Sequence, residues 1–204
     1  PGVLRAAVRR ELGVPHPELL LRLHERHPDR YPVLLESVAG ESRLGRYDLL
    51  FALPGERLVR EAGGRLTGPA AVAGHPTFLG ALDAWQDQAR GAAGDDGPAP
   101  FAGGWFVYLG YELAGEIETR LRLRPSRLPR AVAWRMHGAL LRDRGTGAVE
   151  FRAEHGVPAR AVAAVEADLA DAVEAAPVAA PPLALTLEEE DPQRFRHGVE
   201  AVLE

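Results

Sequence analysis

The feature that most constrains the fold is a strand pattern followed by a turn and a second strand pattern. From Val132 to His137 (VAWRMH), apolar side chains alternate with smaller or polar ones, which is the period of a strand buried on one face. Arg142–Gly147 (RDRGTG) carries turn signals, and Ala148–Arg152 follows as a second β-prone run. Two strands joined by a tight turn pair antiparallel. The sequence therefore predicts a β-hairpin and an antiparallel sheet.

Four other segments have the composition of strands. A Pro54-Gly55 turn signal separates the second of them from the third. Both sides of this signal are β-prone, so we expect two strands with a turn between them. The four predicted strands are Tyr31–Glu36, Arg46–Leu53, Arg57–Arg60 and Trp105–Tyr111.

Apolar residues at helical spacing predict several helices between and after these strands. The predicted helices are Pro17–Arg26, Thr77–Arg90, Ala159–Ala176 and a segment that begins at Asp191. A surface loop is predicted at Gly91–Pro100 and a Pro-rich linker at Ala176–Pro182.

The last predicted helix begins clearly but has no stop signal. Asp191 and Pro192 form an N-cap and first-turn pair, and Phe195, Val199 and Val202 follow at i, i+4 and i+7. No Gly or Pro follows Val199, so the sequence has no stop signal for this helix before its final residue. We therefore expect the natural chain to continue, with a first domain at 1–182 and the start of a second at 183–204.

Composition excludes several kinds of chemistry. The 204 residues contain no cysteine and no lysine, so disulfides, thiolate chemistry and Schiff bases have no residue to form them. The net charge of −5 argues against nucleic acid as the main partner. There is no signal peptide pattern and no apolar run of about 18 residues. We expect a cytoplasmic protein that binds neither nucleic acid nor membrane.

Polar residues at the end of the first predicted strand are candidates for binding a small molecule. Glu36 has the charge to pair with an ammonium group, and Ser37 both donates and accepts hydrogen bonds. Arg46 is suited to a carboxylate and Tyr47 to an apolar side chain. Together these groups suit a free amino acid, and the alternative is an ordinary polar strand end.

Other conspicuous residues favour a structural role. The glycines near Gly104 lack the spacing of a phosphate loop and indicate close backbone approach. Glu112, Glu116 and Glu118 are expected to be solvated charges rather than acid–base catalysts. His24 and His27 lie at i, i+3 without a third ligand in view, so no metal site is expected.

The order of five segments resembles component I of the chorismate-utilising synthases, namely the anthranilate and aminodeoxychorismate synthases. The resemblance covers nearly the whole chain and reaches the start of the family's chorismate-binding domain. The segments are Pro32–Ser37 (PVLLES), Gly45–Tyr47 (GRY), Pro100–Glu112 (PFAGGWFVYLGYE), Leu128–Asp143 and Asp191–Phe195 (DPQRF).

The resemblance implies a fold and an activity. The fold is α+β, half of an antiparallel two-sheet sandwich with flanking helices. The activity is amination of chorismate, with ammonia supplied from glutamine by a glutamine amidotransferase subunit. Mg²⁺ and the catalytic residues belong to the family's carboxyl-terminal domain, so no residue of this chain is expected to be catalytic. Asp48 follows Arg46-Tyr47 where anthranilate synthases tend to have serine, which favours aminodeoxychorismate synthase and p-aminobenzoate synthesis.

The resemblance also implies a pocket for L-tryptophan, which regulates the anthranilate branch. The residues that correspond to this pocket are Glu36, Ser37, Leu44, Gly45, Arg46 and Tyr47. Three alternatives to the aminodeoxychorismate assignment remain open: anthranilate synthase component I, a stand-alone tryptophan-binding module, and a domain that only docks a glutaminase. If the catalytic half is missing, apolar surface is exposed, and the isolated chain is then expected to be marginally stable.

Overall fold

The computed structural model describes residues 7–10, 18–37, 45–89, 100–101, 103–124, 127–174, 186 and 191–203. The chain divides into two compact units, Pro1–Glu174 and Ala175–Glu204. All described strands belong to the first unit, and the described part of the second unit contains one helix.

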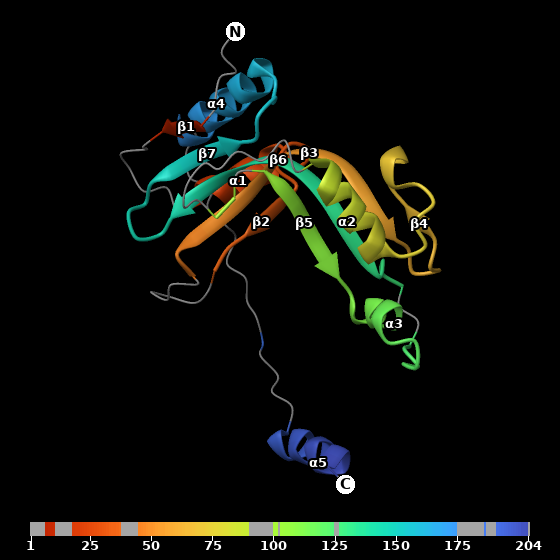
Figure 1. Cartoon of the computed structure of the whole chain (residues 1–204). Coiled ribbons are helices and arrows are strands. Elements are labelled where there is room, and N and C mark those ends of the chain that lie inside the picture. The colour runs from red at the N-terminus through yellow and green to blue at the C-terminus, as the bar shows by residue number, and fades with distance from the viewer. Residues whose placement is uncertain are drawn as a thin grey trace. The chain divides into compact units, whose positions relative to one another are not determined.

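The first unit is built on one antiparallel sheet, shown in Figure 1. The order of the strands is β1-β7-β6-β3-β2, and two further strands extend it, with β4 pairing with β3 and β5 pairing with β6. The long strands β3 and β6 run alongside each other from the Tyr47↔Asp143 pair to the Arg60↔Ala131 pair. The strands are β1 (Ala7–Arg10), β2 (Val33–Leu35), β3 (Tyr47–Arg60), β4 (Leu66–Thr67), β5 (Gly104–Leu109), β6 (Ala131–Asp143) and β7 (Val149–Ala153).

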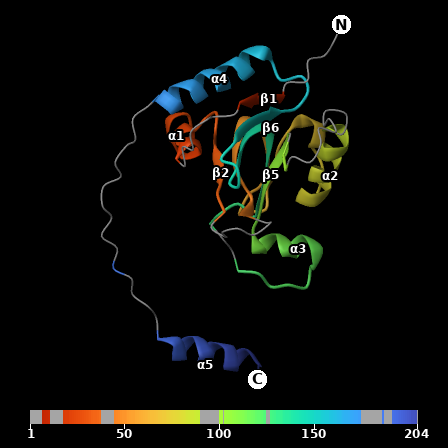
Figure 2. The same cartoon turned by 90° about the vertical axis from the view of Figure 1, so that its left-hand side faces the viewer.

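Helices lie against this sheet and against one another (Figure 2). The helices are α1 (Leu19–Arg26), α2 (Phe78–Ala89), α3 (Ala114–Ile117), α4 (Ala159–Glu174) and, in the second unit, α5 (Pro192–Leu203), with 3₁₀ turns at Ala70–Val72 and Tyr111–Leu113. Leucines of α1 and Val165 of α4 form one buried cluster with Leu50, Leu140 and Phe151 of the sheet. Phe78 and Trp85 of α2 form a second cluster with other strand residues.

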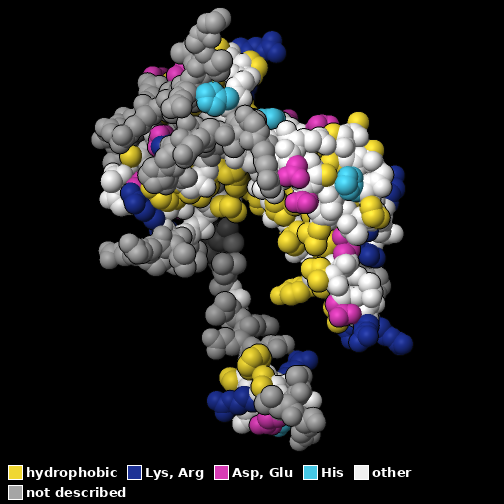
Figure 3. Space-filling model, viewed as in Figure 1, with side chains coloured by type: hydrophobic (Ala, Val, Ile, Leu, Met, Phe, Trp, Pro, Cys, Tyr) yellow, Lys and Arg dark blue, Asp and Glu magenta, His cyan; other side chains and the backbone are white. Residues whose placement is uncertain are grey.

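A third cluster lies on the opposite face of the sheet. Phe51 follows Leu50 directly in β3, and successive strand residues point to opposite faces. Phe51, Met136 and Ala139 are buried there, with Leu49 and Trp134 packed around them. None of the described helices contributes a residue to this cluster. Figure 3 shows hydrophobic side chains gathered on the side of the unit where β5 and α3 lie, and exposed hydrophobics there are Val107, Tyr108, Leu109, Tyr111 and Ile117.

The predicted hairpin is confirmed, but the turn predicted at Pro54-Gly55 is wrong. The hairpin strands are β6 and β7, and their pairing is antiparallel. At Pro54-Gly55 the chain does not reverse: β3 continues to Arg60 with a register shift between Pro54 and Arg57. Leu53, just before the shift, has a positive φ of 56°. A bulge accommodates the missing N–H of proline while β6 supplies partners on both sides of it.

The predicted helices are confirmed with small changes at their ends. In α5 the side chain of Asp191 accepts a hydrogen bond from the backbone N–H of Gln193 at 3.0 Å, as expected of an N-cap. The predicted loop Gly91–Pro100, apart from Pro100, and the predicted linker Ala176–Pro182 lie outside the described residues. No helix in the described part of the chain is long and apolar enough to cross a membrane.

The prediction that Glu116 is a solvated charge is wrong. Its side chain is only 12% exposed and lies 2.6 Å from Nε of Arg60. Its other oxygen accepts the backbone N–H of Phe78 at 2.9 Å, at the first residue of α2. Glu116 therefore holds the start of α2, where a negative charge also interacts favourably with the helix dipole.

A buried carboxylate ties α4 to the segment that leads from α1 into β2. Asp168 of α4 accepts the hydroxyl of Tyr31 at 2.8 Å and also pairs with Arg30. Burial, followed by this hydrogen bond, raises the pKa of the Tyr31 phenol. Nε2 of His27 lies 3.5 Å from the same carboxylate, and Nδ1 of His24 lies 2.6 Å from the carbonyl oxygen of Tyr31. Both histidines thus have structural contacts at this junction.

Candidate functional site

The residues predicted to bind an amino acid lie where β2 ends and β3 begins. The side chain of Asp48 joins these two segments, because its Oδ1 accepts the backbone N–H of Ser37 at 3.1 Å. We use the name motif cluster for Glu36, Ser37, Gly45, Arg46, Tyr47 and Asp48. Gly45 is buried, Ser37 and Tyr47 are half-buried, and Glu36 and Arg46 are exposed. Leu44, the remaining predicted residue, lies outside the described residues.

Asp48 is the buried centre of the motif cluster. Its side chain is fully buried and accepts two hydrogen bonds from Arg142 of β6, from Nε at 2.9 Å and from Nη2 at 2.5 Å. Asp48 and Arg142 face each other in the ladder between β3 and β6. A buried carboxylate needs such a partner, because without one its desolvation costs several kcal/mol.

Arg46 has a partner within the protein. Its Nε and Nη2 lie 2.9 Å and 2.6 Å from Oδ2 of Asp143, and its guanidinium lies 4.9 Å from the centre of the Tyr47 ring. The hydrogen bond from Arg46 lowers the pKa of the Asp143 carboxyl, and the same bond raises the pKa of Arg46. A ligand carboxylate that binds Arg46 therefore competes with Asp143 for the guanidinium.

The turn between β6 and β7 completes the motif cluster. The side chain of Arg144 donates to the carbonyl of Ser37, and the backbone N–H of Arg144 donates to the carbonyl of Arg46 at 2.8 Å. Arg144 also lies 4.0 Å from Oδ1 of Asp48. Two segments separated in sequence are thus held together by one hairpin. The cluster presents a carboxylate, a hydroxyl, a guanidinium and an aromatic ring at one edge of the sheet.

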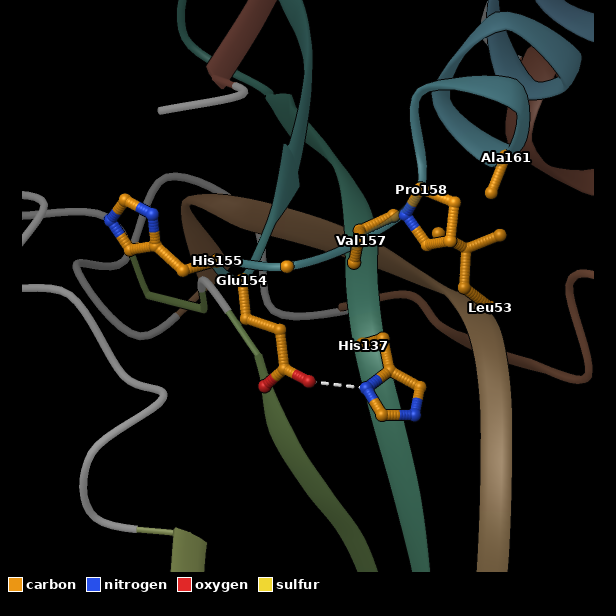
Figure 4. A pocket seen from close by; sticks show the side chains of 8 residues that line it. Leu53, His137, Glu154, His155, Val157, Pro158 and Ala161 are labelled. Carbon is orange, nitrogen blue, oxygen red and sulfur yellow. Dashed lines mark hydrogen bonds and ion pairs between the residues drawn. The ribbon is translucent and has the colours of Figure 1, made fainter. Parts of the chain in front are cut away.

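A second candidate site is a cavity beside the bulge of β3, which we call the bulge cavity. It has a volume of about 260 Å³. Figure 4 shows its lining, in which the side chain of His137 lies below Val157 and points toward the side of Leu53. The lining residues come from β3, β6, the end of β7 and the start of α4, and they are Leu53, His137, Glu154, His155, Gly156, Val157, Pro158 and Ala161.

Two largely buried charged residues, Arg135 and Glu154, hold His137 at this cavity, and Glu154 is itself part of the lining. The carboxylate of Glu154, only 7% exposed, pairs with Arg135 and accepts a hydrogen bond from Nδ1 of His137. Arg135 is 10% exposed, donates to the carbonyl of Gly104 at 2.7 Å and stacks over Trp105 at 4.4 Å. His137 and Glu154 both line the cavity, and His137, at 39%, is the most exposed member of the group. The arrangement is a histidine oriented by a carboxylate, which is suited to accepting a proton or a hydrogen bond.

Sequence reasoning did not identify Asp48, Arg135 or Glu154 as buried. The alternation in β6 indicated that the face with Arg135 is the polar one, yet Ala133 and Arg135 are buried, whereas Trp134 is only partly buried. Among these three residues, only Asp48 stood out in the sequence, because anthranilate synthases, one branch of the family that the chain resembles, tend to have serine at this position. Comparison with protein-family models finds no match to this chain, and comparison with curated proteins finds none.

Proposed function

We propose that this chain is the amino-terminal part of aminodeoxychorismate synthase component I. The enzyme replaces the ring 4-hydroxyl of chorismate by an amine, using ammonia that a glutamine amidotransferase subunit releases from glutamine. The observation that carries the proposal is the contact between the two motifs of the resemblance. The PVLLES and GRYD segments adjoin through the hydrogen bond from the N–H of Ser37 to Asp48. Motifs that act together in one site have to lie together in the fold.

The sheet face to which no described helix contributes a cluster residue, together with exposed apolar side chains on β5 and α3, supports the proposed sandwich architecture. Phe51, Met136 and Ala139 lie on the face opposite to α1, α2 and α4, and aromatic residues surround them. These three residues are buried by strand and loop side chains, but Val107, Leu109 and Ile117 at the β5–α3 side are exposed, and exposed apolar side chains that gather on one side mark a surface that another element covers. A second sheet packed on this face at the usual spacing would complete a sandwich. We propose that the other half of the enzyme supplies this sheet.

Asp48 favours the aminodeoxychorismate branch over the anthranilate branch. The resemblance associates aspartate at this position with the first and serine with the second. In this fold a serine in place of Asp48 would remove the carboxylate that neutralises Arg142, whose side chain is 17% exposed. The charges of Asp48 and Arg142 therefore depend on each other. We expect related proteins with aspartate at the position of Asp48 to have arginine at the position of Arg142.

Catalysis itself is assigned to the domain that follows. The reaction of this family uses Mg²⁺, but within the described residues no three His, Asp or Glu side chains converge to hold a metal ion. The described part of the chain thus does not fit the ion. The role proposed for this domain is to form one half of the sandwich and to carry the effector pocket.

Growth of cells tests the proposed function. A bacterial strain without its own aminodeoxychorismate synthase component I requires p-aminobenzoate. Expression of the complete protein that contains this chain is expected to remove that requirement while the strain retains its glutaminase subunit. A strain that instead lacks anthranilate synthase component I and requires tryptophan serves as the matched control. Rescue of the tryptophan strain alone would assign the protein to the other branch, and rescue of neither would contradict the proposal.

We further propose that the motif cluster, with groups from the other half of the enzyme, binds L-tryptophan. At about 100 times the Kd, tryptophan is expected to raise the free energy of unfolding of the complete protein by about 2.7 kcal/mol. Thermal unfolding with and without tryptophan measures this effect. Ser37→Phe is expected to abolish the increase by filling the site, and Glu25→Phe, on the exposed side of α1, is expected to retain it. An equal increase in both variants would place the tryptophan elsewhere.

A further inference from the structure

The bulge cavity has an apolar wall and three polar side chains in its lining, those of His137, Glu154 and His155. Leu53, Val157, Pro158 and Ala161 supply the wall. The two oxygens of Glu154 are paired with Arg135 and His137, and His155 points away from Leu53 and Ala161 in Figure 4, so His137 is the polar group that faces the wall. Ligand pockets have this composition, in which apolar residues enclose the ligand and a few polar atoms orient it. The volume of about 260 Å³ lies just below the range of about 300–1,000 Å³ that is usual for such pockets. The cavity is therefore of a size for a molecule with a single ring.

The hydrogen bond to Glu154 determines what His137 offers to a ligand. Nδ1 of His137 faces a carboxylate oxygen, so Nδ1 carries the proton. In the neutral imidazole Nε2 is then a hydrogen-bond acceptor. Arg135 neutralises Glu154, because its guanidinium pairs with the other carboxylate oxygen. The ring of His137 is thus fixed in orientation, with one acceptor nitrogen turned away from Glu154, as Figure 4 shows.

The backbone at the bulge is shaped around this ring. A Cβ atom on Gly55 would lie 2.7 Å from Nε2 of His137, which is closer than atoms that are not bonded approach each other. Glycine at this position leaves the space that Nε2 occupies. Leu53, which lines the cavity, has a φ of 56°. Strained non-glycine residues of this kind cluster at binding sites, where the surrounding structure holds them.

We propose that the bulge cavity binds a small, mainly apolar molecule that carries one hydrogen-bond donor, of the chemical class of a phenol. Nε2 of His137 accepts the hydrogen bond from the ligand, and the apolar wall from Leu53 to Ala161 encloses its ring. This site is separate from the motif cluster, and the inference does not rest on the proposed function.

Titration calorimetry with phenol and anisole tests the proposal on the complete protein. The two probes share a ring, but anisole has a methyl ether in place of the hydroxyl and cannot donate. Phenol is expected to show saturable binding at a single site. Anisole is expected to bind roughly tenfold more weakly, because it lacks one hydrogen bond. Absence of saturable phenol binding, or equal affinity for the two probes, would overturn the proposal.

Three variants locate the site. Gly55→Ala places a methyl group against Nε2 of His137. Because this blocks the hydrogen bond from phenol, the variant is expected to bind phenol at least about tenfold more weakly. Gly63→Ala is the matched control, because a Cβ there meets no atom within 4 Å, and it is expected to bind phenol normally. His137→Phe keeps a ring but removes the acceptor, so phenol and anisole are expected to bind this variant equally. A preference for phenol that persists in His137→Phe would show that another group accepts the hydrogen bond.

Discussion

Replacing Asp48 by alanine is expected to lower the free energy of unfolding by about 3 to 5 kcal/mol. The Asp48 side chain is fully buried, and its carboxylate is the acceptor for Nε and Nη2 of Arg142. Its removal leaves a largely buried guanidinium without this counter-charge and the N–H of Ser37 without its acceptor. Urea unfolding followed by circular dichroism measures the change.

A neighbouring ion pair, where β3 begins and β6 ends, provides the control. Arg46, the residue before β3, forms an ion pair with Asp143 at the end of β6, but the Arg46 side chain is 58% exposed. Water replaces the lost partner at an exposed site, so Arg46→Ala is expected to change stability little. The double variant Asp48→Leu, Arg142→Met is expected to recover much of the lost stability, because it removes both buried charges together. Equal effects of Asp48→Ala and Arg46→Ala would contradict the view that burial makes the Asp48 pair important.

Replacing Arg135 by alanine is expected to cost a similar amount, about 3 to 5 kcal/mol. This change leaves the carboxylate of Glu154, 7% exposed, without its cationic partner. It also removes the stacking of the guanidinium on Trp105 and the hydrogen bond to the carbonyl of Gly104. The same denaturation experiment measures the loss, and the fluorescence of Trp105 reports the local change.

The control for this second variant is an arginine on the surface. Arg124→Ala, in an exposed segment, removes the same charge from the protein and is expected to change stability by no more than about 0.5 kcal/mol. The comparison separates the effect of burial from the effect of net charge. If Arg135→Ala were as mild as Arg124→Ala, Glu154 would have another means of stabilisation, and the orientation of His137 by a fixed carboxylate would lose its basis.

Elements that depend on neighbours in sequence could be predicted. The hairpin of β6 and β7 follows from an alternating pattern and a six-residue turn segment, Arg142–Gly147. The N-cap of α5 likewise depends on residues next to one another. In both cases the interactions that decide the structure are within a few residues, so the sequence contains the whole signal.

Features that depend on distant partners could not be predicted. Pro54-Gly55 is a local turn signal, but β6 pairs with β3 on both sides of it, and tertiary pairing prevails over local preference. Asp48 and its partner Arg142 are 94 residues apart, and Glu116 and Phe78 are 38 residues apart. A charged residue in a sequence is usually solvated, and only the position of its partner shows that it is buried. The same reason explains why the bulge cavity had no signal in the sequence.

The most direct test of the proposed function is to identify the product that the complete protein makes from chorismate. The purified protein is incubated with chorismate, ammonium and Mg²⁺, and the products are separated by liquid chromatography and identified by mass spectrometry and fluorescence. The expected product is 4-amino-4-deoxychorismate, which keeps the enolpyruvyl group of chorismate. Accumulation of fluorescent anthranilate would assign the chain to the other branch. Chorismate that remains unconsumed in the presence of ammonium and Mg²⁺ would contradict the account.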